Sequence, residues 1–164
     1  MDHAQSPGTG LLDSADQLGD ELLRLSRLME RTAAQLAAQR GDGVERASYQ
    51  LLVNLVREGP QRTSTLAEAV HSDPSTVSRQ AASLVHLGLL ERRPDPEDGR
   101  ACLLAATPEG ERVHAERRRR RNEHLAAMTR DWPEADRRMF VTLLERFNND
   151  FAHHRPHILA EDAR

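Results

Sequence analysis

The side chains of residues 73–80 have the types and spacing that read the edges of DNA bases. An arginine such as Arg79 can donate two parallel N–H groups to guanine, and a glutamine such as Gln80 can bond to the edge of adenine. Hydroxyl groups and amides at the start of a helix suit phosphate oxygens. The candidate DNA-contacting residues of this helix are Ser75, Thr76, Ser78, Arg79 and Gln80. The alternative is that the same pattern is only the solvated face of a surface helix.

A second candidate contact lies in the segment PDPEDGR, where Arg100 follows the turn residues of an expected β-hairpin. An arginine at such a tip suits the narrow, negative minor groove of A·T-rich DNA. We expect Asp98 to hold this guanidinium in a bidentate pair before binding. Arg92 and Arg93, on the preceding strand, are further DNA-binding candidates. The alternative is an exposed ion pair that contributes about 0–1 kcal/mol and no recognition.

Five consecutive arginines, Arg117 to Arg121, lie within a predicted helix. Five helical positions span more than one turn, so the run cannot form a single stripe. We expect these side chains to be solvated and paired with acids such as Glu116 and Glu123. Contact with flanking DNA phosphate is the alternative.

The other reactive side chains do not form a recognisable site. Cys102 has no partner cysteine in the chain, and we expect a buried small residue rather than a redox-sensing thiol. His153, His154 and His157 have no neighbouring ligands at a metal-binding spacing, which favours a surface cluster. There is no glycine-rich phosphate loop and no convincing nucleophile–base pair. We therefore expect no metal, no cofactor and no enzymatic activity.

Composition and charge set limits on the function. The 164 residues are 38% hydrophobic and 30% charged, which is typical of a soluble globular protein. No apolar run approaches the roughly 18 residues of a membrane span, and no signal peptide precedes the first helix, so we expect a cytoplasmic protein. The net charge is −3, and residues 57–100 hold six arginines against seven acids. This balance argues mildly against DNA binding, so a positive surface must come from the placement of the arginines.

Repeating hydrophobic residues predict the elements that position these side chains. Gly41 and Gly43 are expected to end the first helix. The second expected helix covers residues 44–58 and ends at Gly59-Pro60. A short third helix follows, with its N-cap expected at Thr63, Ser64 or Thr65. The first helix carries a heptad stripe that needs another helix opposite it, made of Leu11, Ala15, Leu18, Leu22, Leu25, Met29, Thr32 and Leu36.

The second half of the chain is delimited by capping and turn residues. Asp73-Pro74 begins the recognition helix as N-cap and first helical residue, and Gly88 ends it. Residues 89–93 and 100–106 are expected to pair as strands. A long helix opens at Thr107-Pro108, and a further helix begins near residue 131 and ends at Pro156.

Three segments resemble the multiple antibiotic resistance regulator (MarR) family: LAEAVHSDPSTVSR, GLLERRPDPEDGRA and LAATPEG. The resemblance implies a homodimer whose terminal helices interlock and whose winged domains bind a pseudo-palindromic DNA operator, usually as a repressor. It also implies that the acid and the arginine of the family's wing motif are Asp98 and Arg100. The chain differs from the family pattern at His71, where glycine is frequent. Histidine is among the residues that tolerate positive φ, so we expect a strained but workable turn with positive φ at His71.

The resemblance further implies a pocket for a small aromatic or anionic effector between the dimer helices and the winged domain. Its lining candidates are Tyr49, His86 and Arg27, the last on a helix that also carries Arg24 and Arg31. Small ligands of this kind commonly release such regulators from DNA, as oxidants do in some members.

We therefore expect an α+β, mostly α-helical fold: a winged helix-turn-helix with N- and C-terminal dimerisation helices. The expected parts are a flexible N-terminus (1–12), a dimerisation helix (13–43), the DNA-binding domain (44–107), two dimerisation helices (108–155) and a tail (156–164). The expected function is ligand-responsive regulation of transcription by a DNA-bound homodimer. The alternative is a winged-helix interaction or dimerisation module that does not bind DNA.

Overall fold

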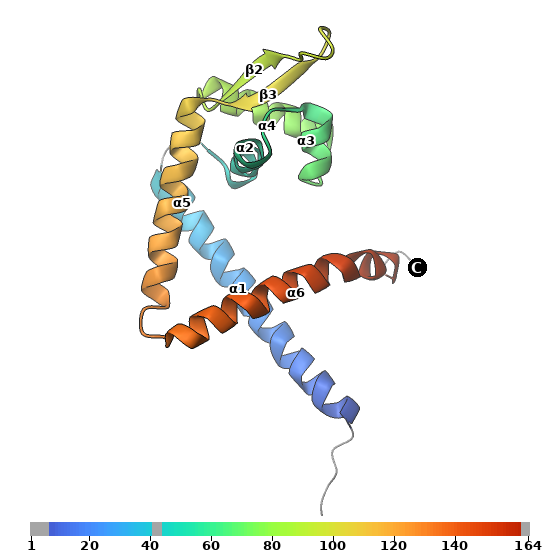
Figure 1. Ribbon diagram of the computed structural model, residues 1–164, viewed down its shortest axis with the longest axis vertical. Coiled ribbons are helices and arrows are strands. Elements are labelled where there is room, and N and C mark those ends of the chain that lie inside the picture. Colours follow the sequence, from blue (N-terminus) through green and yellow to red (C-terminus); the bar gives the residue numbers. More distant parts are fainter. Residues whose placement is uncertain (1–6, 41–43, 162–164) are drawn as a thin grey trace, which may run out of the picture. The chain divides into compact units, whose positions relative to one another are not determined.

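The computed structural model describes residues 7–40 and 44–161, which form long terminal helices and, between these helices in chain order, a group of short helices and strands (Figure 1). The chain groups into two compact units, and the boundary falls after His114, within α5. The elements in chain order are α1 (Pro7–Arg40), α2 (Arg46–Glu58), β1 (Gln61–Arg62), α3 (Thr63–Ala69), α4 (Pro74–His86), β2 (Leu90–Pro94), β3 (Cys102–Ala106), α5 (Pro108–Met128) and α6 (Glu134–Glu161).

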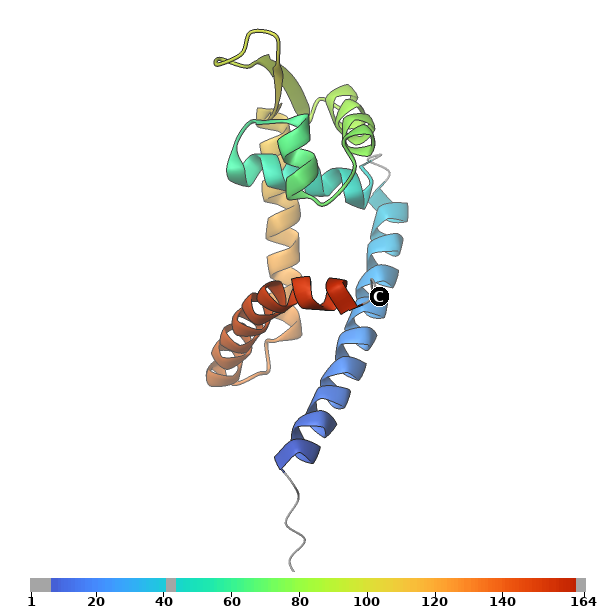
Figure 2. The same ribbon diagram turned by 90° about the vertical axis from the view of Figure 1, so that its right-hand side faces the viewer.

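The sheet of the first unit is antiparallel with the strand order β1-β3-β2. The β2–β3 hairpin extends to the pair Pro94 and Cys102, and the loop that joins these strands reaches beyond the neighbouring helices (Figure 2). On the other side of β3, Arg62 of β1 pairs with Leu103. The sequence did not predict β1, because two residues are too short to show the alternation of a strand.

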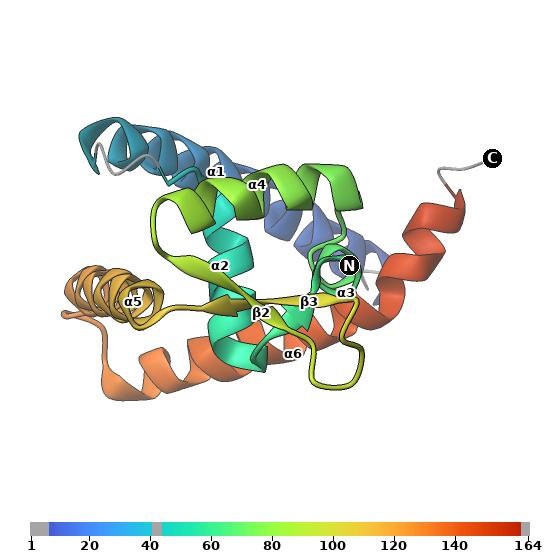
Figure 3. The same cartoon turned by 90° about the horizontal axis from the view of Figure 1, so that it is seen from above.

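Helices α2, α3 and α4 pack against this sheet, and β2 and β3 lie across α2 when seen from above (Figure 3). Helix α4 contributes Val77, Ala81 and Leu84, which follow helical spacing and are fully buried. Burial of each large apolar side chain contributes about 1.5–3 kcal/mol, so this cluster fixes the face that α4 leaves exposed. Its other buried members are Leu51, Leu52, Leu55, Leu66, Ala67, Leu89, Leu90 and Leu104.

Both helices of the helix-turn-helix end in a turn with positive φ. After α4, Gly88 has φ +71°, and the N–H of Leu89 donates to the carbonyl of Leu84 at 2.9 Å. After α3, His71 has φ +52°, and the N–H of Ser72 donates to the carbonyl of Ala67 at 3.0 Å. Both are Schellman-type ends. The predicted glycine stop and the expected positive φ at His71 are confirmed.

Several predicted boundaries were wrong. Helix α1 begins at Pro7, so residues 7–12 are helical, because proline suits the first turn of a helix, where its missing N–H leaves no hydrogen bond unmade. Helix α6 continues through Pro156 to Glu161, so the expected tail is helical up to that residue. A proline inside a helix removes one hydrogen bond and does not necessarily end it. The N-cap of α3 is Arg62, without a side-chain cap.

The expected glycine stops of the first helix, Gly41 and Gly43, lie outside the described residues. Within the described ranges, no helix combines the length and the apolarity needed to cross a membrane.

Helix α5 begins as predicted, with Thr107 as its cap. The Thr107 hydroxyl accepts the N–H of Gly110 at 3.0 Å and donates to the carbonyl of Gly88 at 2.7 Å. One threonine therefore caps α5 and ties it to the turn that ends α4. This fixes where the chain leaves the hairpin.

The terminal helices expose wide apolar surfaces. In α1 the heptad stripe is largely open, with Leu25 51% and Met29 53% exposed. In α6, Phe140 is 50% and Leu143 53% exposed. Exposed apolar surface of this extent marks an interaction site.

Candidate nucleic-acid interface

The structure places all five predicted contact residues of the recognition helix on α4. Ser75, Ser78 and Arg79 are exposed, and Thr76 and Gln80 are half-buried. The Arg79 guanidinium donates from Nη2 to Thr76 Oγ1 at 3.2 Å, which lays it along the first turn of the helix. Among the described residues no carboxylate pairs with Arg79, so its charge is available to an anionic partner.

Asp73 caps α4 as predicted. Its Oδ1 accepts the N–H of Thr76 at 2.9 Å and the hydroxyl of Ser75. These hydrogen bonds, first from Ser75 and then from Thr76, hold the pKa of Asp73 well below its usual range. The hydroxyl of Ser75 therefore already donates its hydrogen bond to Asp73. Donation from this hydroxyl to a DNA phosphate requires that bond to break first.

Arg100 lies in the tight loop at the end of the hairpin. The carbonyl of Asp98 accepts the N–H of Ala101 at 2.9 Å, and Asp98 Oδ1 accepts the backbone N–H of Arg100 at 3.1 Å. The expected carboxylate–guanidinium pair between Asp98 and Arg100 is wrong. Among the described residues the Asp98 carboxylate approaches a different guanidinium, that of Arg62, at 3.7 Å. Arg100 is exposed, and no carboxylate in the described part of the chain pairs with its guanidinium.

Asp95 is the buried anchor of this loop, and the sequence did not predict its role. Its side chain is only 6% exposed, and its Oδ2 accepts from Nε and Nη2 of Arg62 at 2.7 and 2.6 Å. Its Oδ1 accepts the N–H of Glu97 at 2.9 Å. The bond from Glu97 and the contact with Arg62 hold the pKa of Asp95 below its usual value.

The two arginines of β2 differ in their partners. Arg93 pairs with Glu91, with Nε 2.7 Å from the carboxylate, so this positive charge is already neutralised. Arg92 is exposed and forms no ion pair with any described residue. Consecutive residues of a strand point to opposite faces, so Arg92 and Arg93 are not equivalent candidates for one DNA surface.

Residues 44–102 match the family model described as the MarR family. The HTH-type transcriptional regulator YxaD of Bacillus subtilis is 39% identical over 113 residues, which cover 69% of this chain and 79% of that protein. The chain belongs to the MarR family of transcriptional regulators.

Solved structures agree with this assignment. RV1404 from Mycobacterium tuberculosis is 29% identical with a TM-score of 0.72, over 85% of this chain and 95% of that one. The transcriptional regulator Tm0710 from Thermotoga maritima is 26% identical with a TM-score of 0.62, over 84% of this chain and 96% of that one. The predicted mostly helical winged helix-turn-helix fold is confirmed: in this MarR-family chain α3 and α4 form the helix-turn-helix, and the β2–β3 hairpin forms the wing.

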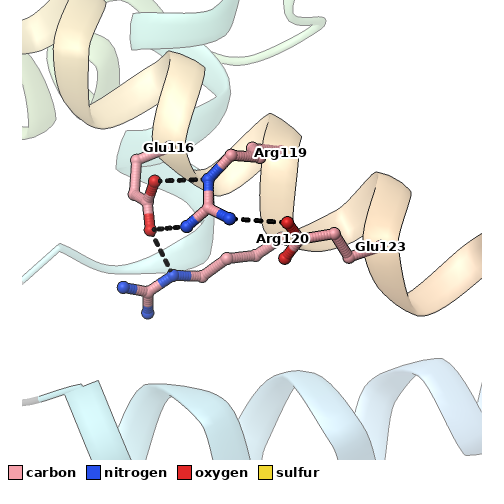
Figure 4. Close-up of polar contacts among 4 residues, drawn as sticks. All are labelled: Glu116, Arg119, Arg120 and Glu123. Carbon is pink, nitrogen blue, oxygen red and sulfur yellow. Dashed lines mark hydrogen bonds and ion pairs between the residues drawn. The ribbon is translucent and has the colours of Figure 1, made fainter.

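The arginine run in α5 forms an ion-pair network on the helix surface (Figure 4). Arg119 donates from Nε and Nη2 to Glu116 at 3.0 and 2.9 Å and from Nη1 to Glu123 at 2.5 Å. Arg120 donates to the same Glu116 at 2.6 Å. Bonds from Arg119 and then Arg120 lower the pKa of Glu116 to about 2. The predicted pairing is confirmed for Arg119, which contacts both Glu116 and Glu123, and for Arg120, which contacts Glu116.

The predicted burial of Cys102 was wrong, because this residue is exposed. It opens β3 opposite Pro94, at the end of the hairpin that projects beyond the helices. Of the three C-terminal histidines, His154 and His157 have ring centroids 5.5 Å apart, and His153 contacts the carbonyl of Asn149. The histidines are exposed, as predicted for a surface cluster.

The three candidate effector residues lie on different helices. Tyr49 on α2 is half-buried, and its hydroxyl is 3.2 Å from Nδ1 of His114, a residue that the sequence did not single out. His86 ends α4 and Arg27 lies on α1, and both are exposed. The contact of a phenol with an imidazole 65 positions later in the chain is non-local, and only the fold reveals it.

Proposed function

We propose that this chain binds a pseudo-palindromic DNA operator as a homodimer and represses transcription until a small aromatic or anionic effector releases it. The observation that carries the proposal is that two arginine side chains form no ion pair with any described residue. Arg79 on α4 and Arg100 on the wing have no carboxylate partner among the described residues, whereas Arg93 and Arg62 do. Arg79 is suited to a guanine edge and Arg100 to a minor groove.

The net charge of −3 argues mildly against DNA binding, but the placement of the charged residues favours it. The acids of the wing are largely held internally: Glu91 by Arg93, and Asp95 and Asp98 by Arg62. Arg62 and Arg93 thus offset two of these three negative charges close to the surface that would face phosphate. The arginines outside these pairs supply the positive charge that binding requires.

The dimer is supported by the exposed apolar faces of α1 and α6. Isologous pairing of two copies covers the same surface on each. It also sets two α4 helices against half-sites about one helical turn apart. We place this regulator in the cytoplasm, where its DNA target would be, and assign it no catalytic role.

The effector is supported by Tyr49 and His114, a half-buried phenol and imidazole in contact. Their polar atoms would bond a small carboxylate or phenol, and the apolar residues Val44 and Val113 lie against the same core. Of the three lining residues that the family resemblance implies, Tyr49 is the one with this environment, and we propose His86 and Arg27 only as accessory contacts.

The DNA-binding proposal is tested by selection of random-sequence duplexes on the purified protein, followed by footprinting. We expect enrichment of an inverted repeat with half-site centres about 10 base pairs apart and affinity that falls steeply with salt. Failure to enrich any sequence would contradict it and favour an interaction module. Effector binding is tested by release of the selected duplex with benzoate, against acetate as the control.

A further inference from the structure

One guanidinium, that of Arg62, connects the wing to the helix-turn-helix. Arg62 is the residue directly before α3 and also pairs with Leu103 in the sheet. Its Nε and Nη2 both reach the buried carboxylate of Asp95, and Nη2 lies 3.7 Å from Asp98. The contacts with Asp95 raise the pKa of Arg62, so it remains charged in this position.

The same carboxylates shape the loop that carries Arg100. Asp95 accepts the N–H of Glu97, and its own N–H donates to the carbonyl of Ala101 at 3.0 Å. Asp98 accepts the N–H of Arg100 at 3.1 Å. A side-chain oxygen that bonds the backbone two residues later fixes an Asx turn. The loop therefore contains two such turns, and Arg62 forms an ion pair with the carboxylate of each.

Removal of Arg62 would leave Asp95 as a buried carboxylate without its cation. A buried charge without its partner is costly, and the chain relieves the cost by reorganising or taking up a proton. Either response disturbs the turn from which Arg100 projects. Arg62 itself is already hydrogen-bonded to Asp95 and ion-paired with Asp98, so a direct phosphate contact is not its main role.

We propose that Arg62 is a positioning residue for DNA recognition, which acts through Asp95 and Asp98 to aim Arg100 of the wing. The proposal rests on the proposed function, because it takes Arg100 to contact DNA. Arg62 touches no base in this scheme. It sets the direction of the wing arginine relative to the helix-turn-helix.

The test is a double-mutant cycle with Arg62→Gln, Arg100→Ala and the double variant, measured on the duplex selected by the wild-type protein. A lost hydrogen-bonded charge corresponds to about tenfold in affinity, so we expect Arg62→Gln to weaken binding about tenfold. In the Arg100→Ala background the same change should have less than about a twofold effect. Equal losses in both backgrounds, or no loss in either, would overturn the proposal.

A readout without DNA separates this inference from the proposed function. Hydrogen exchange of the Arg100 and Ala101 amides should be faster in Arg62→Gln than in the wild type. Unchanged exchange would overturn the positioning role even if DNA binding fell. If the wild type selects no duplex, the proposed function fails; if Arg100→Ala binds as well as the wild type, the wing contact of Arg100 fails. In either case the exchange result still decides what Arg62 does to the loop.

The matched control is Arg112→Gln, which removes an arginine from another bidentate pair, with Glu109 on α5. It changes the charge by the same amount outside the wing and should leave exchange at Arg100 unaltered. If Arg62→Gln does not fold, as judged by circular dichroism, Asp95→Asn replaces it in both measurements. That variant keeps the side-chain shape and removes the charge that Arg62 holds, so the same outcomes apply.

Discussion

Gly110 in the first turn of α5 lies directly against the carbonyl oxygen of Leu89. A Cβ at position 110 would be 2.2 Å from that oxygen and 3.0 Å from Cδ1 of Leu52. The Leu89 carbonyl also accepts the N–H of Thr107 at 3.1 Å, so it cannot move without loss of that bond. The glycine is therefore what lets α5 begin immediately beside the hairpin.

We predict that Gly110→Ala destabilises the winged domain. Overpacking at such a contact costs about 1–3 kcal/mol, which should appear as a lower midpoint in urea unfolding. Gly99→Ala is the control, since nothing lies within 4 Å of a Cβ there. Equal stability of Gly110→Ala and the wild type would show that the backbone at Leu89 yields easily.

Asp73 should matter as a cap of α4, because its Oδ1 holds the N–H of Thr76. Asp73→Ala removes this acceptor and should lower the unfolding midpoint and the operator affinity together. Asparagine retains the oxygen and is an equally good N-cap. Asp73→Asn should therefore unfold much closer to the wild type, and a loss as large as that of alanine would mean that the charge matters rather than the cap.

Stability should decline in acid partly through Asp95. The pKa of this carboxyl is lower in the folded chain than its ordinary value of about 3.9. Its stabilising effect is therefore complete above that ordinary value and is lost as the pH falls through the lowered, folded-state pKa. The difference in unfolding free energy between wild type and Asp95→Asn should be largest near neutral pH and shrink on acidification. A difference that stays constant with pH would contradict this assignment.

Features set by neighbouring residues could be predicted from the sequence, and features set by distant ones could not. Asp73, Gly88 and Thr107 were identified because caps and stops depend on a few adjacent positions. The pair of Arg62 and Asp95 joins residues 33 positions apart, and no local pattern indicates which arginine will reach which acid.

The expected pair of Asp98 with Arg100 shows the same limit. Spacing in the sequence made the nearby guanidinium the obvious partner, but a tight turn directs the Asp98 side chain to the backbone N–H of Arg100 instead. The exposure of Cys102 likewise depends on how far the hairpin extends past the helices. Strand alternation alone does not contain that information.

Arg79 should carry base specificity, and Arg92 a more general attraction to DNA. Arg79→Ala should lower affinity by about 1–3 kcal/mol and relax the preference at one base of each half-site. Arg92→Ala, on an exposed arginine without an ion pair among the described residues, should weaken binding of all sequences and reduce the salt slope by about one. Repeated selection with each variant distinguishes them, and an unchanged consensus for Arg79→Ala would remove the base contact from the proposal.

The exposed stripe of α1 should decide whether two copies assemble. Leu22 and Met29 are 38% and 53% exposed in the single chain, and a carboxylate at either position would be buried without a partner in a helical interface. Leu22→Glu with Met29→Glu should therefore give a monomer in sedimentation velocity and bind the selected duplex much more weakly, because one winged domain reads only one half-site. Gln17→Glu adds a charge to the same helix outside the stripe, about 100° around the axis from Leu18, and should remain dimeric. A dimer in the double variant would assign assembly to α6 alone.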